Sequence, residues 1–237
     1  MTSLIKGRKS ILLSELLSND FLACYHINSQ VTVNRIVTKA REFDIDDVPG
    51  PVRVLTVGSG KFTLKDNKGE LEIINYEDFI NQCKQPPSFL QGRKKCDFVI
   101  VSDQSHILLL EITSARGSVQ NLGLPISNPR TGVVTFPGGK YEKVEYQLSE
   151  SLQTMMQVVT INRFVSQMRF KTALMAYKVI SPSVVSTLGV GINIFSRYLS
   201  IEALETQENG ALLSCPQIEA YGFEYRRINH QASFHLQ

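Results

Sequence analysis

Two short apolar runs, each with an acid at one end, constrain the fold of this 237-residue chain more than any other feature. The stretch KKCDFVIVSDQSHILLLEIT (94–113) places Asp97 before the first run and Glu111 after the second, with a polar turn around 103–105. Residues equidistant from the turn of a β-hairpin lie opposite each other and on the same face of the sheet. Positions 97 and 111 are equidistant from position 104, so we predict that the two carboxylates converge.

Convergent carboxylates repel each other unless they are protonated, separated by water or bridged by a cation. Hard divalent cations such as Mg²⁺ or Mn²⁺ favour oxygen ligands, and a metal held in this way can activate water and stabilise charge on a phosphate group. The alternative is structural: the two acids cap turns or pair with the neighbouring cations Arg93, Lys94 and Lys95. Spacing alone favours the structural interpretation, whereas the surrounding elements favour the metal.

Hydrophobic periodicity predicts the elements that precede this stretch. Apolar residues at helical spacing predict an amphipathic helix over 3–25. Alternating apolar residues predict a strand over 52–57 and a hairpin over 61–76 with its turn at 66–69, and residues 76–84 follow as a short helix. The acid pair is therefore expected to lie within a β-meander.

The strongest helical pattern in the chain comes after the acid pair, over 140–168. A buried-type strand follows at 171–180, and β-like segments recur at 191–199 and 218–228. Strands, then a long helix, then a buried strand predict an α/β core with a mixed central sheet. The apolar stripe of the long helix consists of Val144, Leu148, Leu152, Met155 and Val159.

Composition is that of an ordinary soluble protein, with 43% hydrophobic and 20% charged residues and a net charge of +3. We expect one domain over 1–237, with a core at about 52–182, an N-terminal helical elaboration at 1–51 and a C-terminal β-containing elaboration at 183–237. No apolar run reaches the ~20 residues that a membrane helix needs, so no membrane partner is expected. The four scattered cysteines do not form a zinc-binding pattern and are expected to be reduced thiols in the cytoplasm.

The order of these motifs resembles the PD-(D/E)xK, or restriction-endonuclease-like, nuclease superfamily over roughly residues 60–180. The similarity rests on Cys96–Ile100, the turn, Leu108–Thr113, the KVEYQL helix at 143–148 and the strand at 171–179. The resemblance implies an αβββαβ core and a Mg²⁺- or Mn²⁺-dependent nuclease that hydrolyses phosphodiester bonds in DNA or RNA, as in restriction or antiviral defence. It also implies three metal ligands: the side chains of Asp97 and Glu111 and the carbonyl of Ile112.

The chain departs from the family pattern at Thr113, which occupies the position of the usual lysine. A lysine there would orient water and offset developing negative charge. Either Lys143, at the start of the long helix, replaces it, or Thr113 suffices, or the site is inactive. Gln147 is four residues after Lys143 and is expected to point the same way. Upstream acids that could add a ligand are Glu15 and Glu42, although no spacing argument selects either.

The expected partner is nucleic acid, with DNA placed ahead of RNA. The side chains expected to contact backbone phosphates are Arg93, Lys94, Lys95, Arg116 and Arg130. The glycine- and proline-rich segment at 114–139 is too long and irregular for core, so it is expected to clamp substrate or dock a protein. The competing interpretation is a catalytically inactive nuclease-like module that binds nucleic acid, a protein partner or a second copy of itself.

Overall fold

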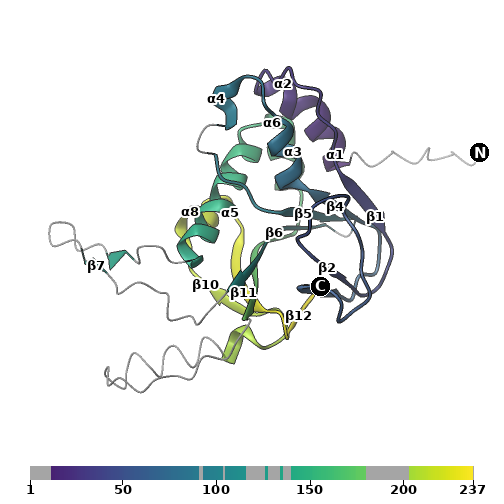
Figure 1. Ribbon diagram of the computed structural model, residues 1–237, viewed down its shortest axis with the longest axis vertical. Coiled ribbons are helices and arrows are strands. Elements are labelled where there is room, and N and C mark those ends of the chain that lie inside the picture. The colour runs from purple at the N-terminus through teal and green to yellow at the C-terminus, as the bar shows by residue number, and fades with distance from the viewer. Residues whose placement is uncertain are drawn as a thin grey trace, which may run out of the picture.

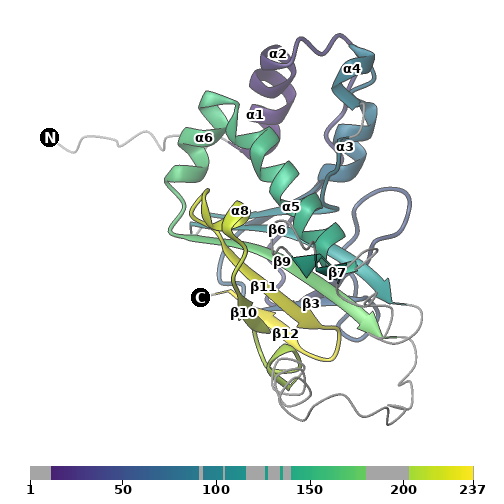
Figure 2. The same ribbon diagram turned by 90° about the vertical axis from the view of Figure 1, so that its left-hand side faces the viewer.

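The computed structural model describes residues 12–90, 93–103, 105–115, 126–127, 134–135, 140–179 and 203–236. These residues form three layers, with helices on one face of a large mixed sheet and a smaller sheet on its other face (Figures 1 and 2). The predicted mixed α/β architecture is confirmed. Because both faces of the large sheet are covered, its central strands are apolar on both sides, as the runs at 98–101 and 107–110 required.

The large sheet has the strand order β1-β4-β5-β6-β9-β11-β10. Strands β4, β5 and β6 form an antiparallel meander, whereas β9 pairs parallel to β6, and β11 pairs parallel to β9. The antiparallel and parallel halves meet at β6, the strand that carries Glu111. The bounds are β1 Arg35–Thr38, β4 Leu71–Asn75, β5 Phe98–Ser102, β6 His106–Ala115, β9 Phe170–Val179, β10 Ala211–Leu213 and β11 Glu224–Asn229.

The smaller sheet contains β2 (Phe43–Ile45), β3 (Phe62–Lys65) and β12 (Ser233–His235), in the order β12-β3-β2. The predicted hairpin over 61–76 is therefore wrong, because its two strands, β3 and β4, belong to different sheets. Asn67 explains why the connection does not form a hairpin. Its side-chain nitrogen donates to the carbonyls of Ala40 and Gly69, and its side-chain oxygen accepts from the Gly69 N–H. These hydrogen bonds fix the chain where it crosses from the small sheet to the large one.

The strand predicted over 52–57 is also wrong, because no strand of either sheet includes these residues. Its only described ladder contact is an isolated bridge between Leu55 and Asp44, so the segment runs along the small sheet as irregular chain. Of the segment predicted as β-like at 218–228, only the last part is a strand, in β11; the first part ends helix α8. A further two-stranded ribbon pairs β7 (Ile126–Ser127) with β8 (Val134–Thr135).

Helices cover one face of the large sheet (Figure 2). The N-terminal helix predicted over 3–25 is confirmed over its described part, where α1, a π-helical turn η1 and α2 follow one another without a break. The short helix predicted over 76–84 is confirmed as α3, between β4 and β5. The bounds are α1 Leu13–Leu16, η1 Leu17–Phe21, α2 Leu22–Cys24, α3 Tyr76–Gln82, α4 Pro87–Leu90, α5 Lys140–Met156, α6 Val159–Ser166 and α8 Pro216–Glu219.

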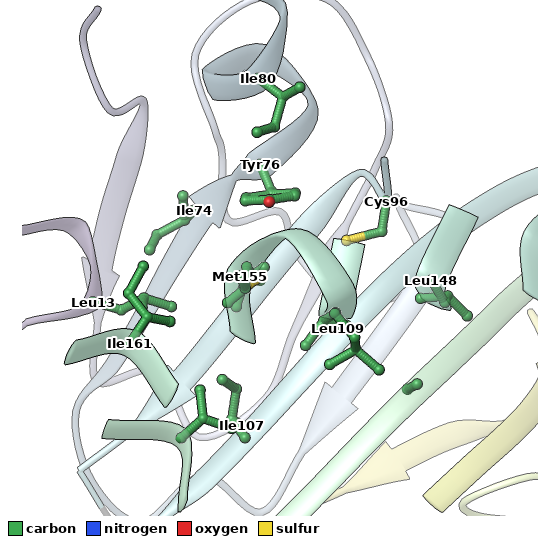
Figure 3. Close-up of a cluster of buried hydrophobic side chains, with 14 of the residues drawn as sticks. Leu13, Ile74, Tyr76, Ile80, Cys96, Ile107, Leu109, Leu148, Met155 and Ile161 are labelled. Atoms are coloured by element: carbon green, nitrogen blue, oxygen red, sulfur yellow. The ribbon is translucent and has the colours of Figure 1, made fainter. Parts of the chain in front are cut away.

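The two faces of each central strand supply two separate hydrophobic cores. Leu109 packs under the helices, near Leu148 and Met155 of α5 (Figure 3), while its neighbours Leu108 and Leu110 pack against the small sheet. Odd-numbered residues of β6 therefore face the helices and even-numbered residues face the small sheet. This alternation determines which side chains reach the candidate site.

The predicted stripe of the long helix is correct for its first four residues, which are all buried, but wrong at Val159, which is 70% exposed. The helix ends at Met156, and α6 begins at Val159 in a new direction. The break turns Val158 into the core in place of Val159. Helical periodicity therefore identified the buried face only as far as the helix continued.

Segments outside the expected core at 52–182 join the same sheet. Strand β1 adds to its antiparallel edge, while β11 and β10 extend it beyond β9. All four cysteines are free thiols. Within the described ranges, no helix has the length and apolar character that crossing a bilayer demands.

Candidate functional site

Asp97 and Glu111 lie at the same end of the β5/β6 ladder. The register pairs Phe98 with Leu110 and Val99 with Leu109, so its continuation places Asp97 opposite Glu111. The register predicted about position 104 is thereby confirmed. Both side chains are on the helix-covered face with Leu109, and both are only 6% exposed. The acid that precedes one buried run and the acid that follows the next are thus on the same face beneath the helix layer.

Each acid has one well-defined hydrogen-bond donor. The Ile112 N–H donates to Asp97 Oδ2 at 2.7 Å, and Gln147 Nε2 donates to Glu111 Oε1 at 2.6 Å. The same Gln147 amide donates to the carbonyl of Lys95 at 3.0 Å, which ties α5 to the segment before β5. Glu111 Oε2 is buried and has no hydrogen-bond partner among the described residues. One carboxylate oxygen is therefore left for a ligand.

The electrostatics of the pair oppose ionisation. Burial, followed by the charge of Glu111, raises the pKa of Asp97, while the Ile112 N–H acts in the opposite direction. Burial also raises the pKa of Glu111, against the lowering effects of the Gln147 hydrogen bond and the Lys143 charge. A bound cation would reverse this balance by favouring the ionised form of both carboxyl groups.

Two further acids, Asp47 and Glu77, complete a carboxylate cluster with Asp97. One ligand oxygen from each lies within 4.8 Å of the others. Glu77 is in the first turn of α3, and the N–H groups of Tyr76 and Glu77 both donate to the Asp97 carbonyl, at 2.8 and 3.2 Å. Burial raises the pKa of Asp47, with Lys61 lowering it. The acids therefore come from three chain segments.

Sequence reasoning missed both additional acids. For Glu77 a signal exists, because it follows the apolar run of β4, as a strand-end acid does, and β4 is the strand next to β5. For Asp47, in the irregular segment after β2, no local signal exists, since only the tertiary fold brings it to the sheet end. Glu15 and Glu42, the acids considered instead, are not members of the cluster.

The two candidates for the lysine role lie on either side of the pair. Lys143 is in the first turn of α5 with an exposed side chain, and its charge lowers the pKa of Glu111. Thr113 is two residues beyond Glu111 on the same face of β6, half-buried and paired with Tyr177 of β9. The positions of Lys143 and Thr113 are both compatible with a role beside Glu111. Ile112 is in the site through its N–H, and the role of its carbonyl stays a prediction.

The predicted phosphate-contacting cations differ in how they are used. Arg93 lies 4.4 Å from the Phe89 ring centroid and donates to Thr154 at 2.6 Å, so it packs within the helix layer. Lys95 donates to Asn81 at 2.6 Å, and Lys94 is exposed. Arg116 and Arg130 lie outside the described residues, as does most of the segment at 114–139.

Comparison of the chain with protein-family models, curated proteins and solved structures finds no match. Functional inference therefore rests on the site itself. The cluster of Asp47, Glu77 and Asp97 offers only oxygen donors, which suit a hard divalent cation such as Mg²⁺ or Mn²⁺. Glu111, whose Oε2 has no partner among the described residues, is not a member of that cluster, although its charge raises the pKa of Asp97. The chemistry that this arrangement permits is hydrolysis assisted by a metal.

Proposed function

We propose that the protein is a cytoplasmic, Mg²⁺- or Mn²⁺-dependent nuclease that hydrolyses phosphodiester bonds, with DNA as the preferred substrate. The observation that carries the proposal is the buried pair Asp97 and Glu111, which share one face and leave Glu111 Oε2 without a donor among the described residues. Because the pKa values of both groups are raised, ionising the pair without a cation would cost several kcal/mol. A divalent cation would remove that cost, which is what the proposal requires of it.

Asp97, Glu111 and the Ile112 carbonyl would hold the cation, and Glu77 and Asp47, which each have an oxygen within 4.8 Å of one from Asp97, would add carboxylate ligands. When bound, a divalent cation supplies an activated water and offsets charge on the scissile phosphate. Gln147 orients the Glu111 carboxylate through its 2.6 Å hydrogen bond. It acts as a positioning residue, because its own contacts are with the protein.

Lys143 is the residue that we assign to the role of the missing family lysine. Its ammonium group interacts with Glu111 and is carried by the exposed first turn of α5, where a substrate phosphate has access. A cation at this position would offset charge that develops on the phosphate in the transition state. Thr113 offers a neutral hydroxyl on the other side of Glu111, able to hydrogen-bond a water but unable to supply charge.

The topology supports the superfamily resemblance. The meander β4-β5-β6, followed by α5 and the parallel strand β9, has the order of a restriction-endonuclease-like core. The acids lie where the antiparallel meander meets the parallel strand. This agreement in element order adds to the site chemistry and does not replace it.

The test is cleavage of single- and double-stranded DNA and RNA with Mg²⁺ or Mn²⁺. We expect Asp97→Asn and Glu111→Gln each to reduce metal-dependent cleavage by more than roughly 100-fold, and Lys143→Met by about 100-fold. Glu42→Gln is the matched control, because it removes an exposed carboxylate outside the cluster. All variants should retain the melting temperature of the wild type or exceed it.

The outcomes separate the competing interpretations. Cleavage that survives both Asp97→Asn and Glu111→Gln would refute the proposed site. Nucleic acid bound but not cut by the wild type would support the inactive module, which the neutral Thr113 favours. If Thr113→Val lost the activity of the wild type and Lys143→Met retained it, the role of the family lysine would belong to Thr113.

A further inference from the structure

A polar cavity of about 200 Å³ lies at the end of the large sheet opposite the acid pair. The first residues of β6, β9 and β11 form its floor, because these three strands run parallel and begin side by side. Phe234 and His235 of β12 close it from the small sheet. Arg169, Asn209 and Gly222, which lie in connections between elements, complete its lining.

Three cationic side chains, Arg169, Lys171 and Arg226, line the cavity against one acid, Glu224. Arg226 is held by Glu224, with both nitrogen–oxygen distances at 3.0 Å. None of the ion pairs among the described residues involves Arg169 or Lys171. Two positive charges therefore remain for a ligand after the internal pair is counted.

The two histidines of the cavity wall do not add to this charge. Burial lowers the pKa of His106, which stacks on Phe170 with ring centroids 4.5 Å apart. His235 is paired with two acids outside the cavity lining, 2.7 Å from Asp66 and 3.5 Å from Glu208. The charge excess of the cavity consequently comes from Arg169 and Lys171 alone.

The cavity is separate from the acid pair. His106 and Glu111 are five residues apart on β6, which corresponds to roughly 16 Å along the strand. His106 faces the small sheet, whereas Glu111 faces the helices. Lys171 pairs with Ile107 and therefore starts on the helix-covered face, but its Nζ reaches the sheet end, 3.8 Å from the position that a Cβ would take at Gly222 in the cavity wall. One phosphate group cannot contact both places.

We propose that this cavity is a second ligand site, which binds the phosphate group of a small phosphate or phosphomonoester through Arg169 and Lys171. A planar guanidinium and a mobile ammonium are the groups that bind phosphate oxygens best. The volume suits a compact oxyanion, since drug-sized ligands occupy about 300 Å³ or more. A stacked base has no free aromatic face here, because His106 covers one side of Phe170 and Arg169 lies 5.0 Å from its ring.

The experiment is a calorimetric or NMR titration of the full chain with inorganic phosphate in metal-free buffer. We expect saturable binding with a Kd of about 1 mM or tighter, and a loss of roughly tenfold or more in affinity in Arg169→Gln and in Lys171→Gln. Lys178→Gln is the matched control, because it removes an exposed positive charge near the other end of β9. Its affinity should equal that of the wild type.

Two further measurements identify the natural ligand and test whether the cavity is independent of the acid pair. Tighter binding of a nucleoside 5′-monophosphate than of inorganic phosphate would make a phosphomonoester the natural ligand, and equal or weaker binding would make it free phosphate. Asp97→Asn should leave phosphate affinity unchanged, so the cavity can be tested whether or not the chain cleaves nucleic acid. No saturable phosphate binding by the wild type, or unchanged affinity in folded Lys171→Gln, would overturn the proposal.

Discussion

Asp44 and Glu111 are both buried carboxylates, but their surroundings are opposite. Asp44 accepts hydrogen bonds from the N–H groups of Gly58 and Gly60, at 2.7 and 2.8 Å, and from the Thr63 hydroxyl, at 2.7 Å. Glu111 has one side-chain donor, Gln147, and one oxygen without a described partner. Both oxygens of Asp44 therefore accept hydrogen bonds from the chain, whereas one oxygen of Glu111 accepts none from the described residues.

The contrast separates a structural acid from one to which we assign a function. A buried carboxylate stabilises a fold when donors saturate its oxygens, and it destabilises the fold when a like charge is its neighbour. Asp44 fixes the loop at 58–60 to the small sheet, because its carboxylate accepts hydrogen bonds from both. Asp97 and Glu111 repel each other on the helix-covered face, and among the described residues the Lys143 charge and the two hydrogen bonds do not offset the effect of burial on their pKa values.

The largest expected effect lies on the structural side of the comparison. Asp44→Ala leaves two N–H groups and one hydroxyl without their acceptor, so we expect the free energy of unfolding to fall by about 3 kcal/mol. Asp97→Asn removes a repulsive charge and should leave the free energy of unfolding of the metal-free protein unchanged or higher. Urea denaturation of both variants checks the contrast, and equal losses would show that the two acids have the same role.

Divalent metal should affect the acid pair and not Asp44. At a Mg²⁺ or Mn²⁺ concentration of about 100 times Kd, binding to the folded state alone adds about 2.7 kcal/mol to the free energy of unfolding. We expect this gain in the wild type and its loss in Glu111→Gln, measured by thermal denaturation with and without EDTA. A gain that persists in Glu111→Gln would place the cation elsewhere.

The pH dependence of stability should report the same incomplete pair. Because the pKa of Asp97 is raised in the folded protein, the folded state binds more protons than the unfolded state above the ordinary carboxyl range. Stability therefore falls as pH rises from about 4, by up to about 1.4 kcal/mol per pH unit for one proton. The difference between wild type and Asp97→Asn, both in EDTA, isolates this contribution. Parallel stability curves would contradict it.

The sequence was sufficient for the part of the site that is local. Asp97 and Glu111 flank two runs joined by a short turn, so pairing by symmetry about position 104 placed them correctly, and helical spacing brought Gln147 to Glu111. The hairpin at 61–76 failed because strand alternation identifies strands but not the sheet that each one joins. The position of Asp47 likewise depends on how the small sheet packs on the large one, which hydrophobic periodicity does not predict.

The smallest expected effect tests the acid that only the tertiary fold reveals. Asp47 is exposed and reaches the cluster from the segment after β2, so it is screened by solvent, and its contribution to cation binding should be modest. We expect Asp47→Asn to weaken Mn²⁺ binding by roughly threefold to tenfold and Glu77→Gln to weaken it by at least as much. Glu42→Gln should have no effect. Calorimetric titration with Mn²⁺ distinguishes these variants. If Asp47→Asn and Glu42→Gln were indistinguishable, the cation would depend on the sheet-end acids alone, and the nearness of Asp47 would be incidental to binding.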